Sequence, residues 1–319
     1  MRVVFFGTPE FAVPSLRALV GEGFDVVAVV TQPDKPQGRS RSRLVPPPVK
    51  IAADAEELLV LQPDKPTDRG FVARLQGLEP RPDIGVVVAY GHILKPEVLA
   101  LPARGMVNVH PSLLPELRGA APVEWAIIRG LEETGVTIMQ MTAGMDSGPI
   151  LHQIPHHVDP DVTGGELSDH LAEVGALALV ETLTLVEEDA LRPVPQDDSR
   201  ATYAPKLTRE IARIDWTKGA AAIARLIRGL DPRPGAWTEL DGAELKLFSA
   251  RATGSRGEPG EVLTADGPPG PPPLPPRLLI AAGDGGAVEV EEVQPAGKER
   301  MHAGEWLRGA RLAAGRRFV

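Results

Sequence analysis

The feature that most limits the fold is a regular alternation, over the first 190 residues, of short apolar runs with longer amphipathic stretches. The expected strands cover residues 2–7, 24–30, 57–62, 83–90, 106–110, 136–141 and 150–158. The expected helices cover the stretch from Pro9 to about Val20 and residues 67–77, 120–130 and 163–188. Strands that alternate with helices predict an α/β fold, in which a Rossmann-like, mostly parallel sheet carries helices on both faces.

The pattern changes near residue 190, where Pro, Asp and Ser replace the regular spacing. We interpret residues 190–206 as a linker that follows a larger α/β domain of residues 1–189. Beyond the linker, a helix at 209–229 is expected before several short alternating segments separated by Gly and Pro. Such segments predict a smaller, C-terminal OB-like β-barrel over residues 207–319. A proline-rich run inside the barrel, residues 267–276, is expected to be a surface loop.

Composition excludes several classes of protein. The chain has no cysteine, so disulfides, thiolate zinc sites and cysteine nucleophiles are excluded. It has no apolar run of about eighteen residues that would predict a membrane span. The first residues, MRVVFFGTPEF, lack the charged and apolar regions of a signal peptide. We therefore expect a cytoplasmic protein that does not enter the membrane.

Charge is distributed unevenly along the chain. The net charge of −9 argues against a protein that coats nucleic acid without specificity. Residues 1–206 carry 18 basic and 28 acidic side chains, whereas residues 207–319 carry 16 and 15. Inside the acidic part, residues 31–50 hold five basic side chains and one acidic one. A single basic loop on an acidic body predicts one docking point for a polyanion.

Three polar residues stand where strands of the expected sheet end. Asn108 is the only asparagine in the chain and lies two positions before His110, so both side chains point to one face of a strand. Asp146 lies in a loop between Gly144 and Gly148. Because ligands bind at the carboxyl ends of parallel strands, these residues mark a candidate site. The segments AYGHIL and NVHPSLLP are expected to open onto this same edge.

An amide, an imidazole and a carboxylate suit acyl transfer. Asparagine can donate to a developing oxyanion, histidine can donate or shuttle a proton, and aspartate can orient the histidine or accept the proton of an amine. Because there is no cysteine and no G-x-S-x-G motif, direct attack by a substrate amine is favoured over a covalent acyl-enzyme. From these residues alone, purely structural roles in turns and at a strand end remain open.

Two other signals are weaker. His152, His156 and His157 could indicate a metal site, but no further ligands cluster with them in the sequence. The segment GTPEF supplies one glycine after the first strand and not a G-x-G-x-x-G motif, so binding of a dinucleotide is poorly supported.

Several segments together resemble a known family: GTPEFAVPSL, TQPDKPQGR, VVVAYGHIL, NVHPSLLPELRGAAPVEWAI, GVTIMQM, GMDSG, TYAPKL and ARIDW. The combination is similar to the methionyl-tRNA formyltransferases and runs from residue 2 to residue 298. The resemblance implies a formyltransferase domain joined to a barrel that faces tRNA. It implies transfer of a formyl group from 10-formyltetrahydrofolate to the α-amino group of methionine on initiator tRNA, by a monomer and without a metal.

The resemblance also assigns roles to residues. The family's catalytic residues fall on Asn108, His110 and Asp146. The residues expected to contact the folate are Ser112, Leu113, Leu114 and Pro115, with backbone contacts to the pterin ring from Val88, Ala89, Tyr90 and Gly91. The residues expected to contact tRNA are Lys35, Arg39, Arg41, Arg43 and Lys206.

The chain departs from the family pattern beside the catalytic histidine. Pro111 replaces a glycine, and Glu116-Leu117 replaces an Arg-Trp pair. Proline restrains the preceding His110 to extended backbone, which suits the end of a strand.

Alternative activities are also considered. A formyltransferase for a sugar amine or a glycinamide ribotide would share the three catalytic residues and would not need the basic loop or a tRNA-facing barrel. A non-catalytic RNA-binding protein would bind tRNA without any folate-dependent product. A NAD oxidoreductase is the most remote alternative.

Overall fold

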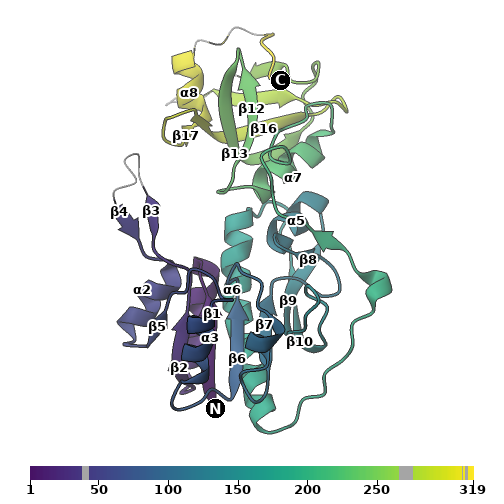
Figure 1. The fold of residues 1–319 in the computed structure, drawn as a ribbon. Helices are drawn as coiled ribbons and strands as arrows, with labels where there is room; N and C mark the ends of the chain where they lie inside the picture. The colour runs from purple at the N-terminus through teal and green to yellow at the C-terminus, as the bar shows by residue number, and fades with distance from the viewer. Residues whose placement is uncertain (38–42, 266–275, 311, 313–314) are drawn as a thin grey trace. The chain divides into compact units, whose positions relative to one another are not determined.

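The computed structural model describes residues 1–37, 43–265, 276–310, 312 and 315–319, and Figure 1 shows its helices and strands. The described chain forms two compact units. The first unit comprises Met1–Gly119, Thr134–His157 and Ser168–Ala204. The second unit comprises Ala120–Glu133, Val158–Leu167 and Pro205–Val319.

The first unit is built on a seven-stranded sheet with the strand order β10-β9-β7-β6-β1-β2-β5. Its strands are β1 (Arg2–Gly7), β2 (Asp25–Val30), β5 (Val60–Leu61), β6 (Ile84–Val88), β7 (Met106–His110), β9 (Glu133–Gln140) and β10 (Ile150–His157). The pairs β1–β2, β1–β6, β2–β5 and β6–β7 are parallel, and β7–β9 is antiparallel. The predicted α/β class with a mostly parallel sheet is therefore confirmed.

Helices surround this sheet because each has one apolar face. They are α1 (Val13–Gly21), α2 (Pro48–Ala55), α3 (Arg69–Gln76), α4 (Pro96–Leu99) and α6 (Gly164–Glu187). In α1, Val13, Leu16 and Leu19 lie on the buried side. At Gly175, α6 lies directly on the sheet, since a Cβ there would be 2.9 Å from Val109 Cγ1 of β7. None of the helices among the described residues has the length and apolar character needed to cross a membrane.

The parallel pairing places the ends of β6 and β7 at one edge of the sheet, as predicted (Figure 1). The loop after β6 is tied to the neighbouring strands through the carbonyl oxygen of Tyr90. This oxygen accepts hydrogen bonds from Thr8 Oγ1 and Gln32 Nε2, both at 3.0 Å. Thr8 follows β1 and Gln32 follows β2, so three strand ends are held together where the candidate site was expected.

The second unit carries a six-stranded sheet in the order β12-β13-β16-β15-β14, with β17 paired to β16. Its strands are β12 (Ala236–Leu240), β13 (Ala243–Thr253), β14 (Val262–Ala265), β15 (Arg277–Ala281), β16 (Ala287–Pro295) and β17 (Met301–His302). All its pairs are antiparallel, and its helices are α5 (Pro122–Arg129), α7 (Ala220–Gly229) and α8 (Ala303–Ala310). The expected small C-terminal β domain is confirmed. Most of the proline-rich run, residues 267–275, lies outside the described residues.

Two sequence expectations about single elements are wrong in part. The helix expected at 209–229 begins only at Ala220, because Ala212 and Ile214 instead exchange backbone hydrogen bonds with Trp237 of β12. The helix α2 was not expected, because residues 31–50 were interpreted as a basic loop; two prolines, Pro46 and Pro47, stand directly before its first residue, Pro48. A proline in the first turn is compatible with a helix because its missing N–H has no partner there.

The segment expected to be a linker, residues 190–206, is anchored for most of its length. Val194 pairs with Ile150 of β10, and β11 (Tyr203–Ala204) pairs in parallel with β8 (Arg118–Gly119). The segment belongs to the first unit as far as Ala204. The division at residues 189 and 207 stays a prediction, and the compact units do not follow these boundaries.

Candidate active site

Asn108 and His110 lie on β7 and face the side of the sheet away from α6. The intervening Val109 packs under α6, and alternation along the strand turns its two neighbours to the opposite face. Asn108 is half-buried, whereas His110 is only 3% exposed. Among the described residues, the side-chain amide of Asn108 has no hydrogen-bond partner. Its donor is therefore available to a substrate.

The imidazole of His110 is fixed from two sides. Its Nε2 lies 3.1 Å from the carbonyl oxygen of Leu117, and its Nδ1 lies 3.8 Å from Oδ2 of Asp146. Because a carbonyl oxygen can only accept a hydrogen bond, this contact assigns the proton of the neutral ring to Nε2. The unprotonated Nδ1 is then left on the side of Asp146.

The protonation state of His110 follows from its surroundings. Burial lowers the pKa of His110, while the Asp146 carboxylate and then the hydrogen bond to Leu117 act in the opposite direction. Because the lowering by burial is the largest effect, the ring is neutral at neutral pH. A neutral imidazole with a free Nδ1 can accept a proton from an attacking amine.

Asp146 is held in an unusual backbone conformation between β9 and β10. Its φ is +48°, a region that aspartate tolerates better than most residues. Its Oδ2 accepts a hydrogen bond of 2.8 Å from the backbone N–H of Gly119. Gly119 has a φ of +127°, and a Cβ there would lie 2.6 Å from the carbonyl oxygen of Ala204, so this position requires glycine.

Two residues that the sequence analysis did not single out complete the site. The side-chain amide of Gln196 donates to the carbonyl oxygens of Asp146 and Gly148, at 2.9 and 2.7 Å. Arg118, which is 5% exposed, donates to Oε1 of Gln196 from both Nε and Nη2, at 3.1 and 2.7 Å. Arg118 lies in the motif NVHPSLLPELRGAAPVEWAI, but no role was assigned to it there. Gln196 belongs to the segment interpreted as a linker, which carries no pattern that would reveal its contacts.

The predicted folate residues Ser112 to Pro115 form a turn after β7 that is mostly buried. The hydroxyl of Ser112 donates to the carbonyl oxygen of Glu116 at 2.6 Å, and Leu114 N donates to Thr137 Oγ1 at 3.1 Å. Of the four residues, all of which the structure describes, Leu113 is the one that is partly exposed. Leu113 is therefore the side chain of this turn that a ligand can reach.

The second group of predicted folate residues, Val88 to Gly91, ends β6. Val88 and Tyr90 are buried, whereas Ala89 and Gly91 are exposed, with φ values of +47° and +82°. The ring of Tyr90 packs edge-on against Phe6 at 5.5 Å between centroids, and burial raises the pKa of its hydroxyl to about 12. Buried side chains thus anchor a stretch of exposed backbone, which fits the polar edge of a flat heterocycle.

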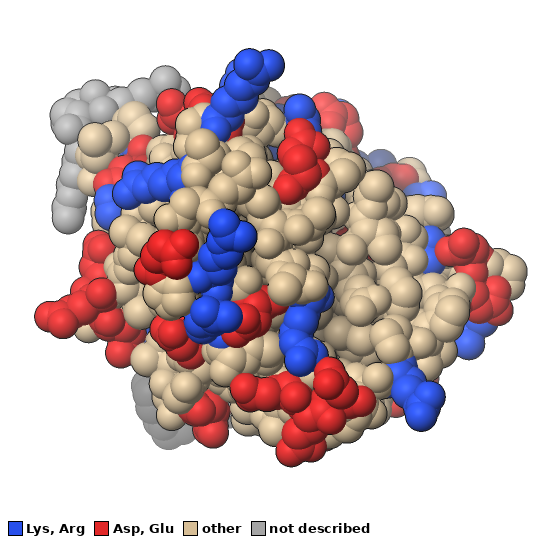
Figure 2. Space-filling model, turned by 60° about the horizontal axis from the view of Figure 1, so that its bottom comes forward, with Lys and Arg blue, Asp and Glu red and all other residues tan. Residues whose placement is uncertain are grey.

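The predicted tRNA contacts are only partly described. Arg39 and Arg41 lie outside the described residues. Lys35 and Arg43 belong to a hairpin of β3 (Lys35–Gln37) and β4 (Arg43–Val45), and Lys206 is exposed in the second unit. On the face drawn in Figure 2, basic and acidic side chains are interspersed and form no large basic field.

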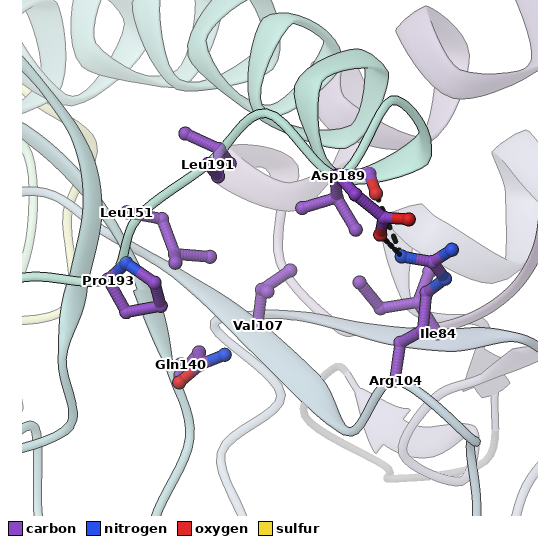
Figure 3. Close-up of a pocket in the computed structure, with 9 residues that line it drawn as sticks. Ile84, Arg104, Val107, Gln140, Leu151, Asp189, Leu191 and Pro193 are labelled. Carbon is purple, nitrogen blue, oxygen red and sulfur yellow. Dashed lines mark hydrogen bonds and ion pairs between the residues drawn. The ribbon is translucent and has the colours of Figure 1, made fainter.

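A pocket elsewhere in the first unit is separate from these residues (Figure 3). Its lining includes Val107, which alternates with Asn108 on β7, and the ion pair of Arg104 with Asp189 at 2.8 Å. None of the predicted site residues lines it.

No group of three potential metal ligands occurs among the residues that the structure describes. Of the histidines considered for a metal, His152 pairs with Glu181 at 3.4 Å, and His156 lies 6.0 Å from His170 between ring centroids.

Comparisons with known proteins define the class. Residues 1–183 match the family model described as formyl transferase, and residues 206–311 match the model of the formyl transferase C-terminal domain. In fold, the chain is similar to HypX from Aquifex aeolicus in complex with tetrahydrofolic acid, with a TM-score of 0.66 and 20% identity. The match covers 96% of this chain and 47% of HypX, so this chain spans about half the length of that protein.

A second solved structure, an N-formyltransferase from Helicobacter canadensis, is similar with a TM-score of 0.67 and 18% identity. That match covers 92% of this chain and 98% of the neighbour. At such low identity both structures show the fold alone. The chain is a formyltransferase, as its two family matches establish.

The particular family follows from the relatives with higher identity. Methionyl-tRNA formyltransferase of Geotalea uraniireducens is 45% identical over 315 residues, which are 99% of this chain and 97% of the relative. The same enzyme of Roseiflexus sp. is 47% identical over 323 residues, covering 100% and 95%. The chain belongs to the methionyl-tRNA formyltransferase family, as its sequence motifs predicted.

Proposed function

We propose that the chain transfers the formyl group of 10-formyltetrahydrofolate to the α-amino group of methionine on initiator tRNA. The observation that carries this proposal is the identity of 42–47% with methionyl-tRNA formyltransferases over nearly the whole length of both chains. The fold does not determine the acceptor, because an N-formyltransferase solved with dTDP-3-aminofucose is similar in fold over 92% of this chain. The basic residues of the loop 31–50 favour a polyanionic acceptor.

In the proposed reaction, Asn108 stabilises the oxyanion. As the amine attacks the formyl carbon, negative charge develops on the formyl oxygen, and a preorganised donor there lowers the barrier. Asn108 suits this role because it lies two residues before the carboxyl end of β7 and its amide has no competing partner among the described residues.

His110 is proposed to carry the proton. In its neutral form Nδ1 is unprotonated, so it can take the proton of the attacking amine and become an imidazolium. The Asp146 carboxylate, 3.8 Å from Nδ1, then stabilises that positive charge. The imidazolium can donate to the oxyanion and afterwards pass its proton to the departing nitrogen. His110 would therefore stabilise the oxyanion only after it has accepted a proton, whereas Asn108 would do so from the start.

The folate is proposed to lie along the backbone of residues 88–91, with Leu113 beside it. When bound, it supplies a formyl carbonyl on a nitrogen that can leave. The exposed backbone of Ala89 and Gly91 suits the hydrogen-bonding edge of a pterin, and the half-buried Leu113 suits its apolar face. The chain's contribution is to hold the formyl carbon near Asn108 and His110.

The test is a formyl-transfer assay with charged initiator tRNA and, as competing acceptors, a sugar amine and glycinamide ribotide. We expect formylated methionine on the tRNA, with kcat/KM falling steeply as salt rises, because contacts to phosphates release counterions. Preferred formylation of a small amine would identify one of the other acceptor classes. Binding of tRNA with no folate-dependent product would identify a non-catalytic RNA-binding protein.

A further inference from the structure

Gln196 connects a distant part of the chain to the loop of Asp146. It follows α6 by nine residues, and its Nε2 donates to the carbonyl oxygens of Asp146 and Gly148, on either side of a turn. Its Oε1 accepts two hydrogen bonds from the buried guanidinium of Arg118. The chemistry proposed above uses neither Gln196 nor Arg118.

The orientation of the Gln196 amide is determined by its partners. A guanidinium can only donate and a carbonyl oxygen can only accept, so Oε1 must face Arg118 and Nε2 must face the loop. Arg118 is itself held, since its Nη2 donates to Asp198 Oδ1 at 2.7 Å. The Arg118 guanidinium thus orients the amide nitrogen of Gln196 towards the Asp146 loop. A half-turn of the amide group would break all of its hydrogen bonds to Arg118 and to the loop.

Two consecutive residues of β8 hold Asp146, one at its carboxylate and the other, indirectly, at its main-chain carbonyl group. The N–H of Gly119 binds its carboxylate, and the side chain of Arg118 reaches its main-chain carbonyl through Gln196. Leu117, the residue before them, accepts the hydrogen bond of His110 Nε2. Three consecutive residues therefore fix the imidazole and the carboxylate relative to each other.

We infer that Gln196, aimed by Arg118, is a positioning residue that holds the Asp146 carboxylate at its working distance from His110. The inference rests on the proposed function only in that Asp146 acts in formyl transfer. The segment after α6 is on this view a part of the active site.

The decisive variant is Gln196→Glu. It keeps the shape and the contact with Arg118, which becomes an ion pair, but it replaces the two donors by an oxygen that faces two carbonyl oxygens. We expect kcat to fall about 10- to 100-fold with little change in either KM, since a misplacement near 1 Å costs up to about 10² in rate. If Gln196 only tethers its segment to Arg118, kcat of this variant stays at the wild-type value.

Arg104→Ala is the matched control. Arg104, which precedes β7, ties that end of the strand to the end of α6, just before the segment of Gln196, through Val186 O and Asp189 Oδ1. These hydrogen bonds involve no residue of the site. We expect its kcat to equal that of the wild type. A loss equal to that of Gln196→Glu would show that any loosening of this segment suffices, which would overturn the specific role of Gln196.

A double-mutant cycle tests whether Gln196 acts through Asp146. In an Asp146→Asn background, Gln196→Glu should lower the remaining rate by less than twofold, because residues that work as a unit are not additive. A full further loss of 10- to 100-fold would overturn the inference.

A readout without turnover separates this inference from the proposed function. In Gln196→Met, the Asp146 carboxylate that raises the pKa of His110 moves away, so the pKa of His110 measured by NMR should fall. An unchanged pKa in this variant overturns the inference even if no formyl transfer is found. Absence of formyl transfer by the wild type would instead refute the proposed function.

Discussion

Gly119→Ala is the change whose effect follows most directly from the geometry. Gly119 has a φ of +127°, and a Cβ there would lie 2.6 Å from the main-chain oxygen of Ala204. An ordinary contact begins at 3.4 Å, so β8 must move about 0.8 Å away from β11. The N–H that binds the Asp146 carboxylate moves with β8.

The magnitude has two parts. A side chain in this backbone region costs about 1–3 kcal/mol, and overpacking against a backbone atom adds about 1–3 kcal/mol, so we expect a loss of roughly 2–6 kcal/mol in the free energy of unfolding. The displacement of the N–H should lower kcat by about 10- to 100-fold. Both KM values should change little, because Gly119 is not among the residues proposed to bind either substrate.

Gly105→Ala is the matched control for this variant. Gly105 also has a positive φ, +70°, but a Cβ there would meet nothing within 4 Å. It should lose about 1–2 kcal/mol of stability and keep the wild-type kcat. Urea denaturation and initial rates of tRNA formylation measure both quantities. If Gly119→Ala folds and its kcat equals that of Gly105→Ala, the Gly119 contact does not position Asp146.

Four further predictions concern the chemistry and the tRNA. Asn108→Ala should lower kcat by about 10²–10³-fold, while the free energy of unfolding changes by less than about 0.5 kcal/mol. Initial rates and urea denaturation measure the two quantities. A kcat close to that of the wild type would show that Asn108 does not stabilise the oxyanion. Because the pKa of His110 is lowered below its ordinary value of about 6.5, kcat should stay constant from pH 8 to about 6.5 and fall only below it. As the pH falls, His110 becomes protonated in the unfolded chain before it does so in the folded protein, because its pKa is higher in the unfolded chain. Its contribution to the free energy of unfolding is therefore present above about pH 6.5 and is lost as the pH falls towards the pKa of the folded protein. In Asp146→Asn, the pH at which the remaining kcat falls to half should be lower than in the wild type, because the carboxylate that raises the pKa of His110 is gone. A shift of this pH to a higher value would contradict the assignment of His110 as the group that accepts the proton. Arg39→Ala should raise KM for tRNA and reduce the salt slope by about one, whereas an unchanged slope would exclude a phosphate contact.

The sequence predicts the sheet and the first catalytic strand well because both depend on local patterns. The buried run MVNVH coincides with β7 residue for residue, and alternation along it places Asn108 and His110 on one face. Pairing in parallel with β6 follows from the α/β alternation. These features are set by neighbours in the chain, which is why a pattern read along the sequence finds them.

The remaining parts of the site depend on contacts between distant residues. The hydrogen bond from Gln196 to the Asp146 carbonyl joins positions 50 residues apart, and the one from Arg118 to Gln196 joins positions 78 apart. A Pro- and Asp-rich segment carries no periodicity that would reveal such a partner. The helix expected at 209–229 fails at its start for the same reason, since Trp237 takes the hydrogen bonds that a helix would use.

The pairing of β8 with β11 has a consequence for the order in which activity arises during synthesis. A chain made from its N-terminus has β7 and the Asp146 loop available well before residues 196–204 have been added. Until that later segment pairs with Arg118 and Gly119, the carboxylate lacks part of its support. The sheet can therefore form early, while a working arrangement of His110 and Asp146 must wait for the chain to reach Ala204.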